Sequence, residues 1–141
     1  MLGLGNSLVN SSVSSWAPSD ESSLVAWYQY QTGITLNGSN VSEWADYTGN
    51  YNMVQATAAK QPAYSSGTLT FDSADTQFLQ TTGQISLAGD FTIGFRVYTT
   101  AFTGTVLGDN TAVNEFMRFN GATTFRVSIN GNTAQNFNIT S

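Results

Sequence analysis

The chain has 141 residues, enough for one domain with a sizeable core, and 40% of them are hydrophobic and 13% aromatic. Only 9% are charged, against about a quarter in ordinary globular proteins, so the polar surface must come from uncharged side chains. There is no cysteine or histidine, which excludes disulfides, thiolate catalysis and histidine catalysis. The net charge is -5, which excludes a nucleic-acid-binding surface, because such a surface needs clustered cations.

The first 23 residues differ from the rest of the chain, because they are mostly small and rich in serine. Leu2, Leu4, Leu8 and Val9 form a short apolar tip, and Trp16 follows it in the sequence. Because these apolar side chains are too few to form a core, the segment is either a floppy terminus or an arm that docks on a partner. Since free exposure of clustered leucines and a tryptophan is unfavourable, we expect residues 1–23 to be a docking arm.

The same terminus lacks the basic start and the sustained apolar stretch of a secretory signal, because Asn6 and Ser7 interrupt it. No segment of the sequence approaches the roughly 20 consecutive apolar residues that a membrane helix requires. We therefore expect a chain that is made and assembled in a cytoplasm and has no membrane partner.

From Leu24 onward the sequence predicts one all-β domain, residues 24–141. Apolar and polar residues alternate along 91–97 and 125–129, which is the period-two pattern of strands with one buried face. Turn signals such as Asn37-Gly38, Ser66-Gly67 and Asn130-Gly131 separate the apolar runs. Further strands are expected at 24–28, 41–46, 61–64, 69–72 and in a run that ends at Ile139. Roughly eight to ten short strands of this kind are typical of a β-sandwich.

Several of these segments also carry the pattern of a known family. Trp27, Trp44, Pro62, the Phe71-Asp72 pair and the run from Phe91 to Ile93 resemble concanavalin A-like jelly-roll domains of the laminin-G type. The resemblance covers about 24–141 and implies a jelly-roll β-sandwich. Such domains have more strands after the last hairpin, so the resemblance also implies a longer polypeptide, completion by a neighbouring subunit, or a compact variant.

The fold leaves the function open, because jelly rolls serve lectins, glycosidases and virus particles alike. Jelly-roll glucanases carry two acids in a Glu-x-Asp-x-x-Glu signature, which is absent here, and Glu21, Glu43 and Glu115 lie far apart in the sequence. We therefore expect no enzyme activity.

Calcium is the one cofactor that the resemblance suggests, because laminin-G-like domains often bind it at a sheet rim. Asp72 and Asp75 could supply oxygen ligands, together with Asp109 and Asn110. The simpler interpretation is that these aspartates cap turns through hydrogen bonds to their own backbone, without any cofactor.

Glycan binding is suggested by a stretch rich in aromatic residues. Tyr47 and Tyr51 flank a Thr-Gly-Asn turn and could stack on sugar rings, as side chains of lectin-like relatives do. The alternation of the neighbouring strands directs Trp27 and Trp44 inward as core anchors instead.

Together these observations favour a structural protein of a virus particle, most simply a bacteriophage. In this hypothesis the chain is a capsid decoration or head-fibre subunit on the virion surface. Its arm docks on capsid or other virion proteins, its jelly roll projects outward, and it forms a homo-oligomer. The alternative is a carbohydrate-binding module of a phage tail fibre or secreted protein, which contacts a cell-surface glycan through Tyr47 and Tyr51.

Overall fold

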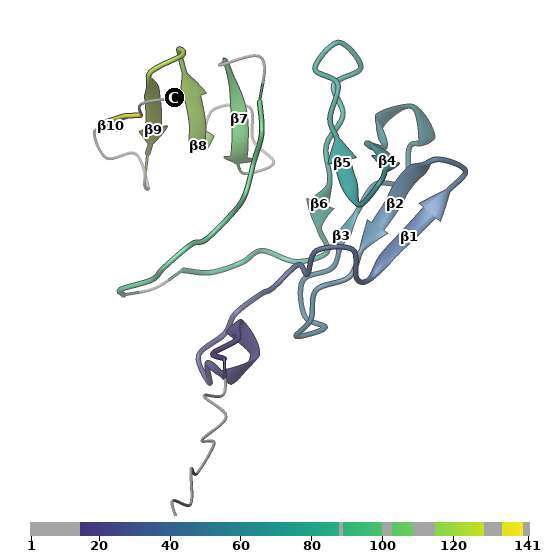
Figure 1. Cartoon of the computed structure of the whole chain (residues 1–141), viewed down its shortest axis with the longest axis horizontal. Helices are drawn as coiled ribbons and strands as arrows, with labels where there is room; N and C mark the ends of the chain where they lie inside the picture. Colours follow the sequence, from purple (N-terminus) through teal and green to yellow (C-terminus); the bar gives the residue numbers. More distant parts are fainter. Residues whose placement is uncertain (1–14, 88, 100–102, 109–114, 129–133, 140–141) are drawn as a thin grey trace, which may run out of the picture. The chain divides into compact units, whose positions relative to one another are not determined.

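The computed structural model of the chain describes residues 15–87, 89–99, 103–108, 115–128 and 134–139. Within these residues the chain is all-β, with two antiparallel sheets and two short 3-10 helices, η1 (Pro18–Asp20) and η2 (Ala58–Lys60) (Figure 1). It divides into two compact units, Met1–Ser86 and Leu87–Ser141, and each unit contains one sheet. All three tryptophans belong to the first unit. The predicted all-β class is confirmed, with ten strands in the described part.

Sheet A, in the first unit, is built around one central strand. Its strands are β1 (Ile34–Asn37), β2 (Asn40–Trp44), β3 (Met53–Val54), β4 (Ala63–Ser65), β5 (Thr68–Thr70) and β6 (Gln80–Thr81). The order is β5-β4-β2-β3-β6, and β1 also pairs with β2. Because β2 pairs with three strands, its side chains lie at the centre of the unit, and Val41 is fully buried there.

Two tight hairpins of sheet A use the turns that the sequence predicts. The β1–β2 hairpin turns at Gly38, where φ is +64°. The β4–β5 hairpin turns at Ser66 and Gly67, with φ of +51° and +81°. Two successive positive φ angles are the mark of a type I′ turn, whose twist matches that of the flanking strands.

The core of the first unit includes polar side chains whose hydrogen bonds are satisfied. Gln55 and Gln61 are 7% and 2% exposed, close to the fully buried Pro62 in the chain. The Gln61 amide donates to the Gln55 carbonyl at 2.7 Å and accepts from the Asn37 amide at 3.1 Å, while the Gln55 amide donates to the Phe78 carbonyl at 3.2 Å. Buried amides are tolerated only when paired in this way.

Sheet B, in the second unit, is a four-stranded meander. Its strands are β7 (Thr103–Gly108), β8 (Glu115–Asn120), β9 (Thr124–Val127) and β10 (Gln135–Asn138), in the order β10-β9-β8-β7. The predicted hairpin between the last two strands is confirmed by their antiparallel pairing. Its turn residues, Asn130 and Gly131, lie outside the described residues.

Two segments predicted as strands are not strands in the structure. In residues 24–28 the backbone of Trp27 bonds to the loop after β2 instead of to a neighbouring strand. Residues 91–97 pack through side chains, since the Phe91 ring lies 6.3 Å from that of Phe116 and the Phe95 ring 5.8 Å from that of Phe125. The alternation of apolar and polar residues indicates only that one face of a segment is apolar. A segment whose side chains pack on a sheet has this pattern without backbone hydrogen bonds to a neighbouring strand.

Candidate functional site

The loop that follows β2 is held by one buried carboxylate, that of Asp46, which is 5% exposed. The loop starts as a tight turn, in which the Gly49 N–H donates to the Asp46 carbonyl at 2.9 Å. Gly49 has a φ of +77°, a conformation that favours glycine. We call residues 46–51 the Asp46 loop.

Both carboxylate oxygens of Asp46 accept several hydrogen bonds. Oδ1 accepts from the N–H of Trp27 at 2.7 Å and of Thr48 at 3.2 Å. Oδ2 accepts from the Thr48 hydroxyl at 2.5 Å, the Asn50 N–H at 3.3 Å and the Tyr51 N–H at 3.2 Å. A carboxylate has about four lone-pair positions, so these five donors occupy it fully. It serves to order the loop and has no capacity left for a metal ion.

The same hydrogen bonds decide the charge of Asp46. Burial raises the pKa of this carboxyl, but the bonds from Thr48, Trp27 and Tyr51 favour the ionised form and outweigh burial. The pKa of Asp46 is therefore lowered from its ordinary value of 3.8. At neutral pH the loop is held by a full negative charge.

A second side chain ties the Asp46 loop to β2. The Asn52 amide oxygen accepts from the Asp46 N–H at 3.1 Å, and the Asn52 amide nitrogen donates to the Glu43 carboxylate at 2.6 Å. The start of the loop is thus fixed through both its side chain and its backbone.

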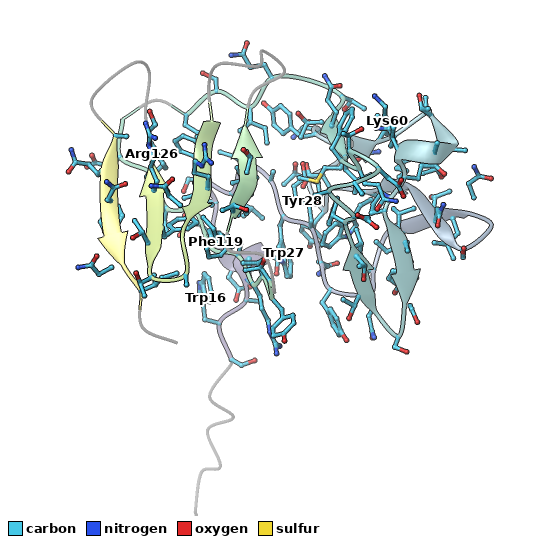
Figure 2. The ribbon with its side chains drawn as sticks, turned by 90° about the horizontal axis from the view of Figure 1, so that it is seen from above. Trp16, Trp27, Tyr28, Lys60, Phe119 and Arg126 are labelled. Atoms are coloured by element: carbon cyan, nitrogen blue, oxygen red, sulfur yellow. The ribbon has the colours of Figure 1, made fainter. Side chains whose placement is uncertain are left out.

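The Asp46 loop presents one exposed aromatic ring, that of Tyr47, which is 56% exposed. Its ring lies 5.1 Å from that of Trp27, at an interplanar angle of 55°, and the Tyr47 N–H donates to the Trp27 carbonyl at 2.8 Å. Trp27, labelled in Figure 2, is half-buried. One side of the tyrosine is therefore braced while the rest remains open to solvent.

The neighbouring aromatic residues are packed more tightly. The Tyr28 hydroxyl donates to the Tyr51 carbonyl at 2.5 Å, and its ring lies 5.6 Å from that of Trp44. Burial, and then the charge of Asp46, raise the pKa of Tyr28 to about 12. The Trp44 indole N–H donates to the carbonyls of Gln29 and Thr32, both at 3.1 Å. Through Tyr28, these contacts link Trp44 to the Asp46 loop.

The two tyrosines predicted as glycan contacts differ in their exposure to solvent. Tyr47 is exposed, whereas Tyr51 is half-buried and its backbone serves Asp46 and Tyr28. The inward tryptophans, Trp27 and Trp44, are half-buried. Sequence reasoning missed Asp46, although an aspartate three residues before a glycine is a known signal for a turn that the aspartate opens.

One of the aspartates considered as a calcium ligand caps a turn instead. The Asp72 carboxylate accepts from the Ala74 N–H at 2.8 Å, the turn-capping role of the simpler interpretation. Asp109 and Asn110 lie outside the described residues. Within the described part, no three acidic, histidine or cysteine side chains are grouped so that they could hold a metal ion.

Most of the predicted docking arm also lies outside the described residues, including Leu2, Leu4, Leu8 and Val9. Trp16 is described, and it is 70% exposed just before η1. A large apolar side chain left open to this degree is notable when it adjoins further leucines in the sequence.

None of the helices in the described part of the chain has the length and apolar character needed to cross a membrane. No protein family, no curated protein and no solved structure matches this chain.

Proposed function

We propose that this protein is a carbohydrate-binding module that stacks Tyr47 against a sugar ring. The observation that carries the proposal is that Tyr47 is 56% exposed on a loop whose conformation is fixed by the buried Asp46. An exposed aromatic ring offers a large contact area for the C–H face of a pyranose. Aromatic surfaces with a few placed polar groups are typical of small-molecule sites.

The rigidity of the loop favours binding, because little conformational entropy remains to be lost. Tyrosine has only two side-chain torsions, and the contact with Trp27 restricts them further. The backbone on either side is bonded to Asp46 or Trp27. Such preorganisation raises affinity without any additional contact.

Polar groups next to the ring can orient a saccharide. Asn50 is exposed, and its amide nitrogen donates to the Thr48 hydroxyl at 3.2 Å. A primary amide has two donor hydrogens and an acceptor oxygen, so Asn50 retains one N–H and its oxygen for sugar hydroxyls. These groups lie within three residues of Tyr47.

A glycan array compared across matched tyrosine variants tests this proposal. Tyr47→Ala should abolish binding that the unaltered chain shows. Tyr98→Ala and Tyr30→Ala remove tyrosines that are 90% and 70% exposed elsewhere in the chain, and both variants should bind as before. Silence of the unaltered chain across a broad array, or full binding by Tyr47→Ala, would refute the proposal.

A second candidate function is that of a bacteriophage capsid decoration or head-fibre subunit, anchored through residues 1–23. The observation that favours it is Trp16, which is 70% exposed beside a serine-rich segment with several leucines. An exposed indole gains most from transfer into an apolar pocket, and tryptophan is enriched among the residues that dominate protein interfaces. Subunits of this kind assemble as symmetric oligomers on the particle.

Purified particles and an arm deletion test the second candidate. Mass spectrometry of virions from the source should find the chain in stoichiometric amounts. A variant lacking residues 1–16 should fold, as judged by circular dichroism, but should fail to load onto particles. Absence from particles, or normal loading of the deletion variant, would rule this function out.

A further inference from the structure

The residues around Tyr47 carry negative charge. The first unit has six acidic side chains and one cationic side chain, that of Lys60. The Lys60 Nζ lies 5.8 Å from the centre of the Phe78 ring, and no lysine or arginine lies between Glu43 and Lys60 in the sequence. Glu43 and Asp46 precede Tyr47 by four residues and by one. The charges nearest to Tyr47 in the sequence are therefore these two carboxylates.

Both carboxylates accept their hydrogen bonds from neutral groups. The five donors to Asp46 are four backbone N–H groups and one hydroxyl. Glu43 accepts from the Asn52 side-chain amide, which in turn accepts from the Asp46 N–H. One side chain thus connects the Glu43 carboxylate to the backbone residue that precedes Tyr47. Hydrogen bonds from neutral donors stabilise a negative charge without cancelling it.

The charge of Asp46 already acts on a neighbouring aromatic side chain. Burial and then this charge raise the pKa of the Tyr28 hydroxyl to about 12, because a second negative charge close to Asp46 is unfavourable. The Tyr28 hydroxyl donates to the Tyr51 carbonyl at the end of the Asp46 loop. A ligand anion beside this loop would meet the same repulsion, whereas a ligand cation would be attracted.

We propose that Tyr47 selects saccharides that carry an ammonium group, the class of deacetylated amino sugars. The Tyr47 ring is 56% exposed, and the face of an aromatic ring attracts cations. Asn50 is exposed in the same loop, and its amide oxygen can accept a hydrogen bond from the ammonium group. The negative charge of Glu43 and Asp46 favours the same ligand and disfavours a uronic acid or a sulfated sugar.

This inference rests on the proposed carbohydrate-binding function, because it names the class of sugar that Tyr47 takes. Stacking on the ring requires only the C–H face of a sugar, whereas the selectivity requires the charge around the ring. A site that stacks neutral and cationic sugars equally well would retain the proposed function and lack the selectivity. The two can therefore be tested separately with sugars that differ in charge.

The test is a calorimetric titration of the full chain with three oligosaccharides of equal length, at a mildly acidic pH and fixed low ionic strength. The probes are glucosamine, N-acetylglucosamine and galacturonic acid oligomers, which are cationic, neutral and anionic. The cationic oligomer should bind about fivefold or more tightly than the neutral one, the gain expected from a cation on an exposed aromatic ring. The anionic oligomer should bind more weakly than either. Tyr47→Ala should abolish binding of the cationic and neutral oligomers alike.

Two variants that each remove one negative charge separate the local charge from the net charge of the chain. Glu43→Gln keeps an acceptor for Asn52 and should lower the preference for the cationic oligomer about two- to threefold. Asp75→Asn, at an exposed position between β5 and β6, should leave it unchanged.

Equal binding of the cationic and neutral oligomers overturns this inference alone, and silence with all three overturns the proposed function as well. The inference is also overturned if Tyr47→Ala still binds the cationic oligomer, or if the two charge variants have equal effects, since the attraction would then be general.

Discussion

Asp46 is the residue on which the candidate carbohydrate site depends. Asp46→Asn keeps the shape of the side chain but replaces one acceptor oxygen with a donor that faces backbone N–H groups. We expect a loss of about 1–3 kcal/mol in the free energy of unfolding, the usual cost of buried polar groups left unpaired. Asp72→Asn, at an exposed aspartate, should cost roughly 0.5 kcal/mol or less. Urea unfolding of the two variants measures the difference, and equal losses would contradict this role.

The same residue sets a dependence on pH. The pKa of Asp46 is lowered in the folded chain from its ordinary value of 3.8. Its contribution is therefore fully present above that value and is lost as the pH falls through the lower, folded-state pKa. The stability difference between the unaltered chain and Asp46→Asn should be constant near neutral pH and shrink in acid. Urea unfolding across this range tests the sign, and a difference that grows in acid would contradict it.

At the scale of elements, the β4–β5 hairpin shows a glycine that is required by its backbone conformation. Gly67 has a φ of +81°, and a Cβ there would meet only the ends of two exposed side chains, the Gln31 amide and the Tyr30 hydroxyl, which can move aside. Gly38 also has a positive φ, but a Cβ there would meet nothing within 4 Å. Gly38→Ala should cost about 1 kcal/mol through backbone strain alone. Gly67→Ala should cost about the same in the same denaturation assay, and a clearly larger cost would show that Gln31 and Tyr30 cannot move aside.

Elements with local signals were predictable from the sequence. The hairpins at Gly38 and at Ser66-Gly67 follow from residues that tolerate positive φ. The prediction of strands at residues 24–28 and 91–97 was wrong, because strand pairing depends on partners far away in the sequence. The alternation of apolar residues does not specify those partners. The sequence also does not indicate the bulge between Thr105 and Leu107. This bulge lets Leu107 pair with Met117 on one face of sheet B while Thr105 pairs with Arg118 on the other.

The candidate site was predictable only in part. Tyr47 was found as an aromatic residue beside a turn, but the carboxylate that orders the turn was not, because a single aspartate carries no signal of its five donors. Pairs of residues across neighbouring strands have no signature in the sequence at all. Arg118 and Arg126 are eight residues apart, and only the register of β8 with β9 makes them neighbours.

At the scale of the whole molecule, charge is divided unevenly between the two units. The first unit has six acidic side chains and one lysine, a net charge of -5, whereas the second has three acidic side chains and three arginines. Acid removes the carboxylate hydrogen bonds of the first unit, including those of Asp46. We expect amide NMR signals of β2 to disappear at a higher pH than those of β8. Coincident loss would show that the two units unfold as one.

The contact between Trp27 and Tyr47 also gives the molecule an optical reporter. All three tryptophans belong to the first unit, and one of them touches the ring proposed to stack on sugar. A saccharide seated on Tyr47 should therefore alter the intrinsic fluorescence emission of Trp27 without any added dye.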